Sequence, residues 1–163
     1  MVDESTLPRM ADRSCPLPGA HTVRMRPTAL LTQFLVAAVV FSVIDVLWLS
    51  TIATDLYDRH LGDLRAESPH VGAAVLVYLV LLAGLVHFVI APAVAAGSWR
   101  RAAGVGAFFG LVVYGVYELT NWAVLADWPA GLVPIDIAWG MFLSASVSVG
   151  TYAVVQRLPA WAR

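Results

Sequence analysis

Four long apolar segments dominate the pattern of hydrophobic and polar positions along the chain. They cover about residues 29–53, 71–95, 102–125 and 131–155. A helix rises about 1.5 Å per residue, so each segment is long enough to cross a hydrocarbon core of roughly 30 Å. The pattern predicts an all-α integral membrane protein, with a four-transmembrane-helix bundle as its domain over residues 29–156.

The polar stretches outside these segments predict little further structure. Residues 1–28 are rich in Pro, Arg, Asp and Ser and lack an apolar period, which is typical of a disordered extension. Met25 directly precedes the first apolar segment and would serve as a start of the chain as well as Met1. That segment is longer than the core of a signal peptide, so we interpret it as an anchor. Residues 55–68 have apolar positions at helical spacing, which predicts a short interfacial helix in the outer loop, and residues 157–163 form a tail.

Composition agrees with a membrane protein and excludes several functions. Of the 163 residues, 60% are hydrophobic and only 13% are charged, which is far too apolar for a water-soluble domain. A net charge of −1 without a basic face excludes nucleic acid as a partner. The single Cys15 forms no internal disulfide, and no Cys or His pair stands at metal-ligand spacing, so we expect no metal and no cofactor. Nucleotide-binding loops and familiar hydrolase motifs are also missing.

Arginines indicate the orientation, because the cytoplasmic loops of membrane proteins are enriched in basic residues. On one side of the predicted spans lie Arg24, Arg26, Arg100, Arg101, Arg157 and Arg163. On the other side, Asp127 is the only charged residue of the last loop. Arg59 and Arg65 in the first outer loop oppose this count, although acidic residues outnumber them there. We therefore expect a multi-pass protein with both termini in the cytoplasm.

Three acidic residues interrupt the apolar segments: Asp45 in the first, Glu118 in the third and Asp136 in the fourth. Counting from the predicted span ends places all three roughly 8 to 12 Å below the outer surface at about 1.5 Å per residue. An acid inside a hydrocarbon core is costly and is by default a functional-site hypothesis. We expect the three carboxyl groups at one level near the outer leaflet, whereas His87 of the second segment lies in the inner half.

Aromatic and amide side chains share the helix faces of these acids. Tyr114 and Asn121 lie one turn before and one turn after Glu118, and each Asp is followed one turn later by a Trp. The candidate functional cluster is Asp45, Trp48, Tyr114, Tyr117, Glu118, Asn121, Asp136 and Trp139.

No Lys or Arg lies inside a predicted span to balance these carboxylates. Burial and mutual repulsion favour the neutral acids. The cluster is therefore either partly protonated or neutralised by a group from outside the spans, such as Arg59, His60, a cation, water, or the head group of a lipid or substrate. In the purely structural alternative, the acids hydrogen-bond across helices and hold the bundle together.

Small residues recur at four-residue spacing in the third and fourth segments. They are Gly106 and Gly110, and Gly140, Ser144 and Ser148. Such faces let helix backbones approach closely. We expect them to pack within the chain rather than to form a dimer seam.

Four motifs in and beside the spans suggest a family. They are Asp45-x-x-Trp48, Tyr57-x-Arg59-His60-Leu61-Gly62, Tyr117-x-x-Thr120-Asn121 and Asp136-x-x-Trp139-Gly140. Over about residues 29–156 the chain resembles the bacterial membrane family called domain of unknown function 2177, which implies the bacterial cytoplasmic (inner) membrane. That family usually has Asp at the position of Glu118, a difference that keeps the acid. Its genes often lie near those of fatty-acid-modifying enzymes, which implies a lipid connection.

Three functions remain open. In the first, the acids handle a lipid head group or a small lipid-soluble ligand, as binding groups or as general acid and base. In the second, they couple a small carrier, acting as a homodimer, to protons or cations. In the third, the protein is a structural membrane subunit. Carriers usually place their site at the midplane, so a cluster near the outer leaflet favours the lipid hypothesis and membrane lipid as the partner.

Overall fold

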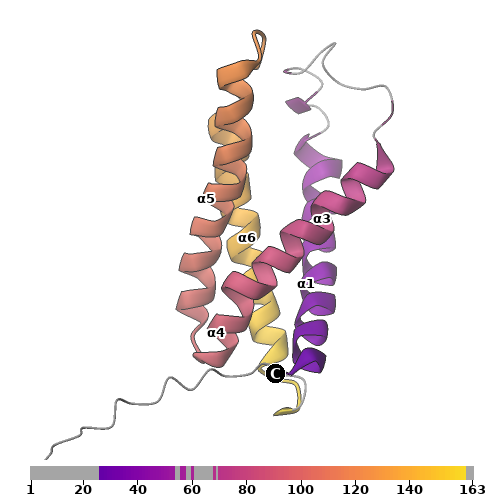
Figure 1. Ribbon diagram of the computed structural model, residues 1–163, viewed down its shortest axis with the longest axis vertical. Coiled ribbons are helices and arrows are strands. Elements are labelled where there is room, and N and C mark those ends of the chain that lie inside the picture. The colour runs from indigo at the N-terminus through magenta and orange to yellow at the C-terminus, as the bar shows by residue number, and fades with distance from the viewer. Residues whose placement is uncertain (1–25, 54–55, 58–59, 61–67, 69, 161–163) are drawn as a thin grey trace, which may run out of the picture.

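The computed structural model describes residues 26–53, 56–57, 60, 68 and 70–160. Its helices (Figure 1) are α1 (Pro27–Trp48), the π-helix η2 (Leu49–Ala53), α3 (Val71–Leu85), the π-helix η4 (Val86–Ile90), α4 (Ala91–Ala95), α5 (Trp99–Val124) and α6 (Val133–Val155). Four segments are long and apolar enough to cross a membrane: Pro27–Ile52, Val71–Ala95, Trp99–Val124 and Val133–Val155. The prediction of an all-α membrane bundle with four transmembrane helices is confirmed.

The predicted span ends and these observed ends agree within one helical turn. Most of the predicted N-terminal extension, residues 1–28, lies outside the described residues. The same holds for most of the predicted interfacial helix, residues 55–68. Of that stretch, Leu56, Tyr57 and His60 are described as helical.

Short sequence signals set the helix ends. Pro27 occupies the first turn of α1, where its missing N–H is no loss. Gly97, with a φ of 60°, makes the turn between α4 and α5, a backbone conformation that glycine adopts without strain. The Ser98 hydroxyl then caps α5 by accepting a hydrogen bond of 3.3 Å from the backbone N–H of Arg101.

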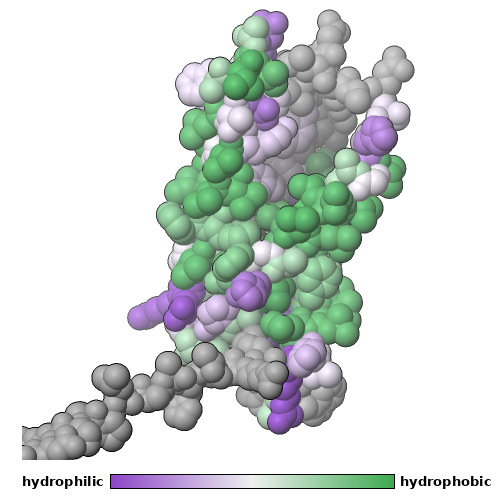
Figure 2. Space-filling view, viewed as in Figure 1, coloured by the Kyte–Doolittle hydropathy of each residue, from purple (hydrophilic) through white to green (hydrophobic). Residues whose placement is uncertain are grey.

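The bundle has two distinct ends. The turn between α4 and α5, the start of α1 and the end of α6 lie together (Figure 1), and we call this the Arg100 end. The opposite end carries the connection between α5 and α6, and we call it the Trp128 end. Figure 2 shows hydrophilic residues near both ends and a hydrophobic band between them, as a membrane-spanning bundle requires.

The second span divides the bundle into a closed half and an open half. Helices α5 and α6 run side by side and share the most extensive contact, and α1 packs along α6. The second span crosses this group obliquely: η4 and α4 contact α5 and α6, whereas α3 leans away from α5 toward the Trp128 end (Figure 1). No side chain from Val71 to Leu81 is buried, but Leu82, Leu85 and Val89 are.

An apolar core fills the bundle from its middle toward the Arg100 end. Its buried members are Ala37, Phe41, Leu82, Leu85, Val86, Val89, Ile90, Leu143 and Val147. In lipid, the association of helices depends on van der Waals packing rather than on the hydrophobic effect. This closely packed half therefore holds the second span in place, whereas the Trp128 end has little apolar packing of its own.

Glycines let α5 and α6 approach closely. A methyl group at Gly110 would overlap the carbonyl oxygen of Gly140, and one at Gly140 would overlap the side chain of Tyr114. A methyl group at Gly106 would lie 2.9 Å from the carbonyl oxygen of Ser144. The expectation that these small residues pack within the chain is confirmed, and their contact fixes the register of α5 against α6.

Gly110→Ala should destabilise the bundle, because its methyl group meets backbone that moves only if α5 and α6 separate. We expect a loss of about 1–3 kcal/mol, the usual cost of overpacking, seen as a lower midpoint of thermal unfolding in detergent. Gly104→Ala on the same helix is the matched control, since nothing lies within 4 Å of its added methyl group. Equal midpoints for the two variants would contradict the close contact.

Candidate functional site

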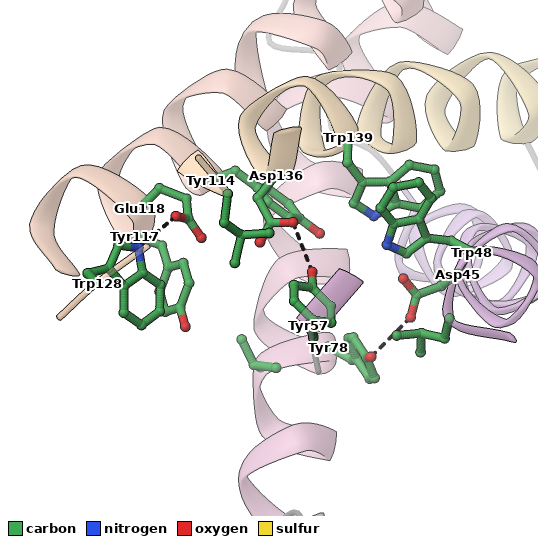
Figure 3. A pocket seen from close by; sticks show the side chains of 13 residues that line it. Asp45, Trp48, Tyr57, Tyr78, Tyr114, Tyr117, Glu118, Trp128, Asp136 and Trp139 are labelled. Atoms are coloured by element: carbon green, nitrogen blue, oxygen red, sulfur yellow. Dashed lines mark hydrogen bonds between the residues drawn. The ribbon is translucent and has the colours of Figure 1, made fainter. Parts of the chain in front are cut away.

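A cavity of about 420 Å³ lies between the spans toward the Trp128 end. We call it the acid cavity. Its described lining residues are Asp45, Trp48, Leu49, Tyr57, Val77, Tyr78, Tyr114, Tyr117, Glu118, Trp128, Leu132, Asp136 and Trp139. They come from every span and from both connections at this end, and Figure 3 shows how their side chains surround one space. The wall is made mostly of aromatic rings and carboxyl groups.

Each acid accepts a hydrogen bond from an aromatic side chain of a different element (Figure 3). The bonds run from Tyr78 Oη to Asp45 Oδ2 (3.0 Å), from Tyr57 Oη to Asp136 Oδ1 (2.9 Å) and from Trp128 Nε1 to Glu118 Oε2 (3.0 Å). They join α3 to α1, the stretch after η2 to α6, and the α5–α6 connection to α5. The acids therefore tie together the half of the bundle that apolar packing leaves open.

Tyr57 keeps its proton at neutral pH. Burial raises the pKa of its phenol above the ordinary value, and the neighbouring Asp136 raises it further. The phenol therefore acts as a donor toward Asp136. The indole N–H of Trp48 approaches the same hydroxyl. That N–H is buried and makes no hydrogen bond of good geometry with the described residues.

Glu118 and Asp136 form a buried pair. Glu118 is 0% exposed and Asp136 is 5% exposed, and their carboxyl groups lie within hydrogen-bonding reach of each other. Two ionised carboxylates cannot hydrogen-bond, because neither carries a donor. With both acids ionised, Glu118 Oε1 has no partner among the described residues. The pair is satisfied only when it holds a proton or when another molecule supplies a donor.

A stacked pair of tryptophans bounds the acid cavity. The rings of Trp48 and Trp139 have centres 4.2 Å apart and planes inclined by 10°. Both residues also line a second hollow of about 480 Å³, which we call the apolar groove. Its other lining residues are Pro134, Ile135, Ala138 and Phe142. The two indoles thus form a wall between a polar cavity and an apolar groove.

All members of the predicted cluster except Asn121 line the acid cavity. Asn121 lies one turn further along α5, within hydrogen-bonding reach of Tyr117. Of the two predicted counter-charges, Arg59 lies outside the described residues. His60 does not line the cavity, and its Nδ1 donates to the carbonyl oxygen of Leu56 at 2.8 Å. Lys, Arg and His are absent from the described lining.

Sequence reasoning missed all three aromatic donors. Tyr78 had a usable signal, because it is the one hydrogen-bonding side chain between Val71 and Val86. Trp128 lies near a span end, where Trp is ordinarily an interfacial residue, so its position in the sequence did not suggest a contact with an acid. Tyr57 follows the first span by only a few residues, and no periodicity reveals that its hydroxyl group reaches Asp136.

We expect the pair to share a proton, and this expectation is open to direct measurement. In detergent at neutral pH without added ligand, we expect an infrared C=O band of a protonated carboxylic acid. Glu118→Gln and Asp136→Asn should each abolish this band, because the remaining acid gains an amide donor and no longer needs the proton. Asp127→Asn, at an exposed loop position, is the control that keeps it. A wild-type spectrum with carboxylate bands alone would contradict the shared proton.

Comparison with known proteins yields a family rather than a function. The family model described as "Predicted membrane protein (DUF2177)" matches residues 30–153. This range contains the three acids and nearly the whole of the four spans. None of the curated proteins and none of the solved structures gives a significant match. The chain therefore belongs to the DUF2177 family of predicted membrane proteins.

Proposed function

We propose that this protein binds an amphiphile, a membrane lipid or another lipid-soluble molecule, with its polar group in the acid cavity. The observation that carries the proposal is the Trp48–Trp139 wall, which has acids and hydroxyl groups on one side and an apolar groove on the other. A molecule with a polar head and a hydrocarbon chain matches both sides. The hydrocarbon tail of the ligand would lie in the apolar groove. The surrounding membrane would supply the ligand.

The size of the acid cavity suits a head group. A volume of about 420 Å³ lies within the range of roughly 300–1,000 Å³ that small-molecule sites occupy. A whole phospholipid does not fit in such a space, but its polar portion does. Convergent polar groups on an aromatic wall are also typical of ligand sites.

The open half of the bundle offers a path from the membrane. The acid cavity is lined by Val77 and Tyr78 of α3 and by Tyr114 and Tyr117 of α5, so it lies between the two helices that diverge. Tyr117 is 56% exposed at this rim. Figure 2 shows the recess between these helices within the hydrophobic band. The polar head would enter through this gap sideways from lipid. The apolar groove is lined by α1 and α6, so the hydrocarbon tail would reach it by displacing the stacked Trp48–Trp139 pair.

The arginines support a position of this path in the outer leaflet. Arg26, Arg100 and Arg157 all lie at the Arg100 end, and basic residues favour the cytoplasmic side. The acid cavity would then lie in the outer half of the bacterial inner membrane. A site displaced from the midplane favours ligand binding over a carrier with alternating access. A proton shared by Glu118 and Asp136 would also suit general acid–base chemistry on a bound ligand.

Orientation is tested by labelling from the outer face of intact cells with a membrane-impermeant thiol reagent. In a Cys15→Ser background, Asp127→Cys should react and Ser98→Cys should not, because the first lies at the Trp128 end and the second in the cytoplasmic turn. Permeabilised cells provide the control that both sites react. Reaction at Ser98→Cys alone in intact cells would move the acid cavity to the inner leaflet.

Amphiphile binding is tested by native mass spectrometry of protein released from a mild detergent. We expect the wild type to retain a lipid or another amphiphile of defined mass. Ala138→Phe fills the apolar groove from an exposed position and should lower retention roughly ten-fold, or about 1.4 kcal/mol. Ala123→Phe, exposed on α5 and absent from both linings, is the matched control with full retention. Equal retention by the two variants, or none by the wild type, would overturn the proposal.

A further inference from the structure

The described lining of the acid cavity offers negative charge and no positive charge. It holds three carboxyl groups and no Lys, Arg or His. Three of its aromatic donors, Tyr57, Tyr78 and Trp128, are already used on the acids. The N–H and O–H groups of the other aromatic side chains remain, but an anionic head group such as a phosphate would meet the like charge of the acids without a cation to balance it. A ligand that brings its own positive charge therefore suits this lining best.

Glu118 shows where that charge would be received. The side chain is fully buried, it lines the acid cavity, and its Oε1 has no partner among the described residues when Asp136 is ionised. An unpaired buried carboxylate oxygen is costly, and a cation beside it removes that cost. The neighbouring carboxyls of Asp136 and Asp45 each accept one neutral donor and have lone pairs left over.

Aromatic rings are the second feature, besides the carboxyl groups, that favours a cation in the acid cavity. The acid cavity is walled by seven of them: Trp48, Tyr57, Tyr78, Tyr114, Tyr117, Trp128 and Trp139. The faces of Trp and Tyr rings attract ammonium groups, and cages of such rings with a carboxylate bind alkylated ammonium ions. This attraction strengthens where water is excluded. An inorganic cation would gain less from such walls than an alkylammonium group, whose methyl or methylene groups contact the rings.

We propose that the acid cavity recognises a positively charged ammonium head, so that the ligand is a cationic or amine-bearing amphiphile. This inference rests on the proposed function and deepens it by naming the ligand class. The ammonium group would lie between the aromatic walls and take the place of the proton held by Glu118 and Asp136. Binding would then release a proton, so acid would weaken it.

The titratable groups that face this position come from every span. They are Asp45 of α1, Tyr57 after η2, Tyr78 of α3, Tyr114, Tyr117 and Glu118 of α5, and Asp136 of α6. The phenols stay neutral in the range of the experiment. Only the carboxyl groups can exchange a proton for the cation.

The test compares dodecyl compounds that differ only in their heads, each below its micelle concentration, by calorimetry on the full chain in a neutral maltoside detergent. Dodecyltrimethylammonium, whose charge is independent of pH, should bind at least ten-fold tighter than dodecanol or dodecyl phosphate. Its affinity should fall several-fold from pH 8 to pH 5. Glu118→Gln should lose the cation preference and the pH dependence, and Asp127→Asn should behave as the wild type.

The outcomes separate this inference from the function on which it rests. Equal binding of the three compounds, or preference for the phosphate, overturns the cationic ligand and leaves an amphiphile site. No binding of any compound overturns both. If Glu118→Gln does not fold, Asp136→Asn, which removes the other acid of the pair, is the second variant, with the same expected loss. Competition by a phospholipid with an ethanolamine head supports a bilayer source of the ammonium group, and competition by free dodecylamine alone supports a lipophilic amine.

Discussion

The close contact of α5 and α6 is the constraint on which the rest of the structure depends. It exists because Gly110 and Gly140 carry no side chain at the point where the two backbones meet. That contact fixes which residues of the two helices face each other. One result is that Glu118 and Asp136, distant in sequence, come within hydrogen-bonding reach. Another is that Tyr114 packs on Gly140 and so reaches the wall of the acid cavity.

Stability and the candidate function occupy different halves of the bundle. From the middle toward the Arg100 end, apolar side chains of α1, the second span and α6 interlock. Toward the Trp128 end the second span leaves its neighbours, and none of its side chains from Val71 to Leu81 is buried. Packing is what holds helices together in lipid, so the loosely packed half is where a ligand could enter without disrupting the fold. Polar bonds replace packing there, since each acid is tied to an aromatic donor on another element.

These hydrogen bonds explain how the membrane tolerates three acids. They do not use all the hydrogen bonds that the carboxyl groups can accept. An acid at the centre of a membrane helix costs about 2.5 to 3.5 kcal/mol on insertion scales, and one neutral hydrogen bond offsets only part of that. A carboxylate accepts several hydrogen bonds, whereas Glu118 receives one, from Trp128. A buried site with unused carboxyl oxygens among aromatic rings is better suited to bind a cation or a proton than to hold helices together. The purely structural reading would instead require the acids to satisfy one another and their neighbours completely.

By itself the sequence determined the four spans and the common depth of Asp45, Glu118 and Asp136, because span length and helical rise are nearly invariant. Counting along helix faces also placed Tyr114, Trp48 and Trp139 beside the acids. Only the tertiary structure decided which spans are neighbours, that Tyr78 and Trp128 bond to acids, and that an apolar groove adjoins the cavity. The reason is that a membrane span is apolar all round. Its packed face and its lipid face look alike in sequence, so periodicity carries little of the signal that reveals the buried face of a soluble helix.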